Sequence, residues 1–192
     1  MSTDPTVLAL SAWAHFTWLP GGERARTERA QAHANADLLV RFPQLASLSA
    51  ASALPPFARL PRPACARLLR VSAALAHAPA LRRVVSADAR KRFAVRIAPR
   101  VLQAIQRDGQ TLHDAEARAP LNVLDREAMT AAGLRLALCA LDDETLRTLM
   151  KLRMPRAVAQ RAAQLDACET RAELARALLD AAHALLQRGD PC

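Results

Sequence analysis

Residues 129–155 read MTAAGLRLALCALDDETLRTLMKLRMP, and this stretch decides the fold. Its run 131–141 is apolar except for Arg135 and has about half of the ~20 residues that a membrane span requires. A nearly apolar run of this length predicts a helix buried in a protein core. The acidic run 142–144 follows it and indicates the start of the next helix, because negative charge is favoured at a helix N-terminus.

Gly133 lies inside the helix that we expect to be buried. A glycine costs about 1 kcal/mol relative to alanine in a helix interior, so its presence predicts that a neighbouring backbone approaches closely. Replacing Gly133 with leucine should then overpack the core.

The composition indicates an all-α protein. Of the 192 residues 52% are apolar but only 3% are aromatic, so alanine and leucine supply most of the core and favour closely packed helices. The five glycines are too few for the turns of a sandwich or barrel. We expect an N-terminal helical segment (1–53), a proline-rich connector (54–63) and a main helical domain (64–192), together forming one structural unit that is an irregular bundle.

Helices are expected between the proline and glycine breaks. The expected ranges are 4–16, 23–41, 64–78, 79–85, 87–107 with a bend at Pro99, 124–141, 143–152, 155–167 and 171–188. The connector reads LPPFARLPRP, whose four prolines predict an extended chain; a ligand for a proline-reading domain is the alternative. Trp13 and Trp18 are interpreted as core anchors, with interface anchors as the alternative, and the sequence leaves open whether the first 42 residues pack on the body.

Sequence motifs for catalysis are missing from the chain. It contains no phosphate-binding loop, dinucleotide fingerprint, HExxH or GxSxG, and its five histidines and four cysteines lack the spacing of a metal site. We therefore expect no enzyme activity, no cofactor and no metal. The N-terminus lacks the pattern of a secretory signal, which predicts a cytoplasmic protein.

Most of the net charge of +9 lies in one segment, which holds eight basic residues and one aspartate between Arg82 and Arg107. If this segment is helical, Phe93, Ile97, Val101 and Ile105 form an apolar stripe beside a stripe of arginines. A segment of this kind can bind an acidic protein, nucleic acid or anionic lipid. The alternative is that the arginines form the solvated side of a surface helix and bind no partner. The candidate partner-binding residues are Arg82, Arg83, Arg90, Arg92, Arg96 and Arg100.

Binding to nucleic acid is the alternative function that a pI of 11.0 suggests. The sequence shows no helix-turn-helix pattern, and Phe93 is the only aromatic residue within the basic run. Only two of the 27 basic residues are lysines, a bias that suggests a GC-rich genome more than a phosphate site. Nucleic acid is thus a less favoured partner.

Two stretches of the chain resemble a known family. Residues 68–85 (LLRVSAALAHAPALRRVV) and 129–155 are similar to the K component of bacterial type III secretion systems, the SctK or YscK family with its Hrp-type counterparts. The order of features along the chain also agrees with that family. An aromatic segment ending in Leu19-Pro20 comes first, followed by a leucine-rich helix with a basic end, a helix of small residues and a Leu-Arg-Met-Pro sequence that ends the helix before it. The resemblance covers residues 63–155 well and the first 42 weakly.

The resemblance implies an all-helical accessory protein of the cytoplasmic sorting platform. Members link the cytoplasmic domain of the inner-membrane ring protein (SctD-like) to the pod protein (SctQ-like), which carries the stalk and ATPase. Neither an enzyme activity nor a cofactor belongs to this role. The resemblance assigns no individual residues to an interface, so the charge pattern alone indicates one.

Overall fold

The computed structural model describes residues 10–23, 27–47, 54–107, 125–165 and 172–187. Every regular element in these ranges is helical, which confirms the all-α prediction. The elements are residues 10–13, η1 (Phe16–Trp18), η2 (Pro20–Gly22), α2 (Glu28–Arg41), η3 (Pro43–Ser47), α3 (Pro56–Arg59), α4 (Arg62–Ala76), α5 (Ala78–Arg82), α6 (Ala87–Ile97), α7 (Pro99–Arg107), α8 (Arg126–Ala140), α9 (Glu144–Arg153), α10 (Arg156–Gln164) and α11 (Ala172–Gln187). The predicted start of the first helix, at residue 4, and the predicted ends of the last one, at residues 171 and 188, lie outside the described residues.

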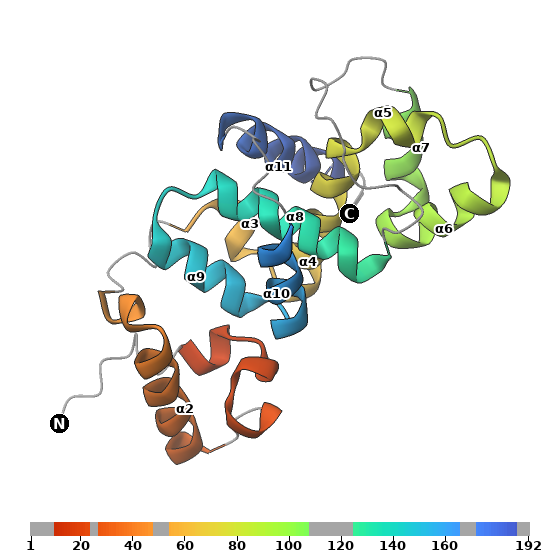
Figure 1. Ribbon diagram of the computed structural model, residues 1–192. Helices are drawn as coiled ribbons and strands as arrows, with labels where there is room; N and C mark the ends of the chain where they lie inside the picture. Colours follow the sequence, from red (N-terminus) through yellow and green to blue (C-terminus); the bar gives the residue numbers. More distant parts are fainter. Residues whose placement is uncertain (1–9, 24–26, 48–53, 108–124, 166–171, 188–192) are drawn as a thin grey trace.

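The centre of the fold is the crossing of α4 and α8 (Figure 1). α8 buries residues on all of its sides, as the apolar run 131–141 predicts. A Cβ atom added to Gly133 would lie 1.9 Å from the backbone oxygen of Leu69 on α4. The predicted close approach at Gly133 is confirmed, because only a residue without a side chain fits at this crossing.

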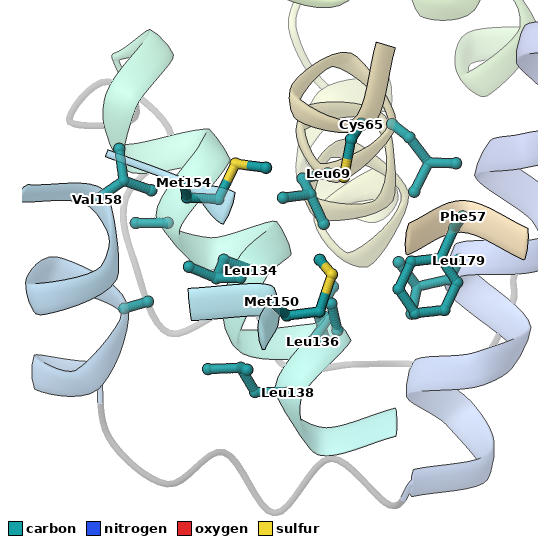
Figure 2. Close-up of a cluster of buried hydrophobic side chains, with 14 of the residues drawn as sticks. Phe57, Cys65, Leu69, Leu134, Leu136, Leu138, Met150, Met154, Val158 and Leu179 are labelled. Carbon is teal, nitrogen blue, oxygen red and sulfur yellow. The ribbon is translucent and has the colours of Figure 1, made fainter. Parts of the chain in front are cut away.

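The core around the crossing is built from leucine, alanine and methionine. Figure 2 shows Leu69 of α4, Leu134 of α8 and Met150 of α9 pointing into a common cluster, which Phe57 and Leu179 close on the side of α11. α11 packs on both central helices, and α10 packs on α8. The aliphatic composition therefore suffices for one continuous core, with aromatic rings mainly at its edges.

The proline-rich connector differs from its prediction. Residues 54–63 are not extended throughout, because Pro56 begins the single helical turn α3 and Pro63 lies in the first turn of α4. Proline fits these positions because the first amides of a helix have no partner within it. Phe57 and Ala58 are buried, so this stretch is part of the core, while the division into three sequence regions remains a prediction.

The basic segment forms two helices instead of one bent helix. α6 ends at Ile97, the next residue Ala98 has a φ of 81° in the left-handed region, and α7 begins at Pro99. The residue before a proline is disfavoured in the helical conformation, which explains the position of the break. α6 and α7 then fold against each other, so the buried apolar residues come from two packed helices and Arg100 does not share a helix face with Arg92.

Candidate protein-binding surface

Helices α5, α6 and α7, residues 78–107, form a lobe at one end of the molecule, which we call the basic lobe (Figure 1). Phe93 and Ile97 of α6 and Val101 and Ile105 of α7 are buried within it, as the apolar stripe predicted. The burial of these residues turns most of the lobe's charged side chains toward its surface.

Several of the predicted partner-binding arginines stabilise the lobe itself. The Nε of Arg82 donates a hydrogen bond to the carbonyl of Ile105 (3.1 Å), and that of Arg90 donates to the carbonyl of Val84 (3.1 Å). The Arg96 guanidinium lies 5.5 Å from the centre of the Phe93 ring, a distance at which cation and ring attract. Arg82, Arg96 and Arg100 are half-buried, whereas Arg90 is exposed.

Three other basic residues of the lobe point into solvent. Arg83, Lys91 and Arg92 are exposed, and within the described ranges none of their side chains forms a hydrogen bond or an ion pair. Two large apolar residues lie beside them, with Val85 78% and Val95 83% exposed. The structure therefore separates Arg82, Arg90 and Arg96, which contact other parts of the lobe, from Arg83 and Arg92, which point into solvent.

Arg70 joins the basic lobe to the core. It is buried on α4, and its Nε donates to the carbonyl of Arg96 in the last turn of α6 (3.0 Å). Burial lowers the pKa of Arg70 to about 10, and the positive charges of Arg126 and Arg67 act in the same direction. At neutral pH the guanidinium stays charged, so this bond to a helix end is a charged one.

Arginines close helix ends throughout the molecule, a role that the sequence analysis missed. Arg62 donates to the carbonyls of Ala12, Trp13 and Ala14 at 2.5 to 2.6 Å, and Arg147 donates to those of Leu138 (3.2 Å) and Leu141 (2.8 Å). Carbonyls at a helix C-terminus have no partner within the helix, and a cation is favoured there. The scarcity of glycine, the usual C-terminal cap, is the signal that was available in the sequence.

The opposite end of the molecule is formed by residues 10–23 and 27–47, which we call the N-terminal segment (Figure 1). The indole Nε1 of Trp13 donates to the carbonyl of Leu149 (2.9 Å), and that of Trp18 donates to the carbonyl of Met154 (2.8 Å). The Arg153 guanidinium lies 4.1 Å from the centre of the Trp13 ring. Both tryptophans are half-buried against the core, in agreement with their interpretation as core anchors, and they attach the segment to the body, a point that the sequence left open.

The acidic run 142–144 has the structural role that the sequence predicted. Asp143 caps α9, because the backbone amide of Leu146 donates to its carboxylate (3.0 Å), and this hydrogen bond holds the pKa of Asp143 below its usual value. Asp142 pairs with Arg176 of α11 (2.5 Å), and Glu144 pairs with Arg147 (3.4 Å). These contacts explain the cluster without any catalytic role.

The histidines and cysteines of the described ranges are dispersed. His77 is buried at the junction of α4 and α5, where burial lowers its pKa, and Cys65 is buried on α4, where burial raises the pKa of its thiol. Over the residues that the structure describes, no three histidine, cysteine or acidic side chains gather as metal ligands. His113, Cys168 and Cys192 lie outside these residues.

The described helices include none that is both long and apolar enough to span a lipid bilayer.

Comparison with known protein families gives a match over residues 5–188, to the family described as YOP proteins translocation protein K (YscK). Neither a curated protein nor a solved structure matches the chain. The family match extends beyond the stretch 63–155 that carried the resemblance and includes the N-terminal segment and α11. The chain therefore belongs to the YscK family and is a component of a type III secretion system.

Proposed function

We propose that this protein is a non-enzymatic adaptor of the cytoplasmic sorting platform, linking the inner-membrane ring protein (SctD-like) to the pod protein (SctQ-like). The observation that carries the proposal is the separation of two unlike regions, the N-terminal segment and the basic lobe, at opposite ends of one helical core (Figure 1). An adaptor needs two surfaces far enough apart for its partners to bind together. On this proposal the protein works in the cytoplasm and is held at the inner membrane by its partners.

The basic lobe supports a contact with an acidic partner. Between Arg82 and Arg107 only Asp88 opposes eight basic residues, so the lobe attracts negative charge and repels other basic surfaces. Arginine favours carboxylates because its planar guanidinium forms two parallel hydrogen bonds with them. The proposed contact residues are Arg82, Arg83, Arg90, Arg92, Arg96 and Arg100.

The experiment is co-purification of the full-length protein with the ring-protein cytoplasmic domain and with the pod protein. Each pair is purified with and without nuclease and at two salt concentrations. Nuclease-resistant complexes with both proteins are the expected result. Failure of the well-folded protein to retain either partner would reject the adaptor, and recovery of nucleic acid alone would favour the alternative function, a basic nucleic-acid-binding regulatory protein.

A further inference from the structure

Resting on the proposed adaptor function, we propose a narrower docking surface on the outward side of α6. This α6 strip consists of Lys91, Arg92 and Val95, all of which are exposed. Its partner is an acidic protein segment that also carries aliphatic side chains.

Helix geometry places the three α6 residues on one side. Positions 91 and 92 lie four and three residues before position 95 and share a helix face with it, whereas Phe93 and Ile97 lie on the opposite face and are buried. The valine at position 95 is 83% exposed, although a valine that packs on its own core loses most of its exposed surface. The strip therefore presents cations and an aliphatic side chain together.

The cations of the strip differ from the other arginines of the lobe. Arg82 and Arg90 donate to carbonyls of the lobe, and Arg96 lies over Phe93, so these three already stabilise the fold. Lys91 and Arg92 do neither within the described residues. A partner carboxylate can thus bind them without breaking a contact that the folded chain needs.

The exposed Val95 favours a protein as the partner of the strip over a membrane or a nucleic acid. A helix that lies in a membrane surface buries a broad apolar face, but the large apolar residues of α6 other than Val95 are turned inward. Phosphates gain nothing from Val95, whereas aliphatic side chains of a protein would pack on it. Asp88 is also exposed on this side, so the acidic stretch of the partner should meet Lys91 and Arg92 rather than pass Asp88.

The test measures the affinity of the full-length protein for each purified partner by isothermal titration calorimetry. Two variants change the strip: the double variant Lys91→Glu with Arg92→Glu, and Val95→Asn. Two matched variants change α2 at the other end: Arg29→Glu, which reverses an exposed charge, and Val40→Asn, which replaces a valine that is 82% exposed. Circular dichroism verifies that all four remain folded.

We expect the double charge reversal to weaken the binding of one partner by about tenfold and to reduce its salt dependence. Val95→Asn should weaken the same partner by about threefold at every salt concentration, because it removes buried apolar area. The α2 variants should leave that partner's affinity unchanged.

If the wild type binds both partners and neither strip variant weakens the binding of either partner, the proposed docking strip is wrong. The adaptor function would be unaffected by that result. If the wild type binds neither partner, the adaptor itself fails. A separate experiment measures the binding of the wild type and the double variant to vesicles with one quarter anionic lipid. Vesicle binding that the double variant abolishes, with protein affinities intact, would overturn the strip as a protein site and assign it to the membrane.

Discussion

The N-terminal segment and the basic lobe are attached to the core in similar ways but differ in charge. Both bury apolar residues in the common core, and both are also held by side-chain bonds to backbone carbonyls. Residues 1–53 contain four acidic and four basic residues, whereas the charge of the lobe remains unbalanced. Uncompensated charge disfavours the compact state through self-repulsion, so the contrast indicates which region gains most from a charged partner.

The largest expected effect concerns the crossing that supports both regions. Gly133→Ala should lower the free energy of unfolding by about 3 kcal/mol, because the added methyl group collides with the backbone of Leu69. Hydrogen exchange should then accelerate in the N-terminal segment and in the basic lobe alike. Chemical denaturation measures the loss of stability, and mass spectrometry locates the exchange.

The sign of this effect is diagnostic. Replacing glycine by alanine in an open helix stabilises it by about 1 kcal/mol. The reverse change at an exposed helical position, Ala36→Gly on α2, serves as the matched control and should cost about 1 kcal/mol. A more stable Gly133→Ala variant would contradict the close crossing of α4 and α8.

The second prediction separates the two regions. Trp13→Ala removes the indole bond to Leu149 and the ring beneath Arg153, so the N-terminal segment should lose about 2 kcal/mol of protection against hydrogen exchange. Amides of α6 and α7 should keep their exchange rates. Trp13→Phe retains a ring and should cost about 1 kcal/mol, and equal loss in both regions would show that the segment is not an independently attached unit.

The third prediction concerns pH at the junction between the core and the basic lobe. Burial lowers the pKa of His77 below 6.5, so the folded state resists a proton that the unfolded state accepts. Stability should therefore fall as the pH drops through 6.5, by at most about 1.4 kcal/mol per pH unit. His77→Asn should flatten this slope, whereas His33→Asn at an exposed position of α2 should not; identical slopes in both variants would remove His77 as the cause.

The smallest expected effect is on the stability of charge-reversed lobes. Arg92→Glu should change the free energy of unfolding by less than about 0.5 kcal/mol, since exposed charges contribute little to folding. Arg96→Glu should cost more, because Arg96 is half-buried and lies over Phe93. Thermal melts of both variants make the comparison, and an equal effect would mean that the Phe93 contact is unimportant for folding.

Local patterns in the sequence predicted much of this fold. Gly133 indicated a close helix crossing, because a glycine inside a helix has an evident energetic cost. Asp143 indicated a helix start, because a cap depends on residues within a few positions of each other. The anchoring of the N-terminal segment was left open, because Trp13 and Leu149 are 136 positions apart and no local pattern links them. The break at Ala98 was expected only as a bend, since alanine gives no sign of a positive φ.

The candidate surface was less predictable than the fold. The sequence located the excess charge, but it could not distinguish Arg82, which bonds to Ile105, from Arg92, which points into solvent. That distinction depends on which helix ends lie beside each guanidinium. Tertiary structure alone determines this, because the carbonyls concerned are distant in sequence or belong to another helix.

The most direct test of the central claim asks whether both partners bind at once. The full-length protein, the ring-protein cytoplasmic domain and the pod protein are mixed and analysed by size-exclusion chromatography with light scattering. Two surfaces at opposite ends of the core predict one species that contains all three proteins. Displacement of one partner by the other would contradict the account, because it would place both on a single surface.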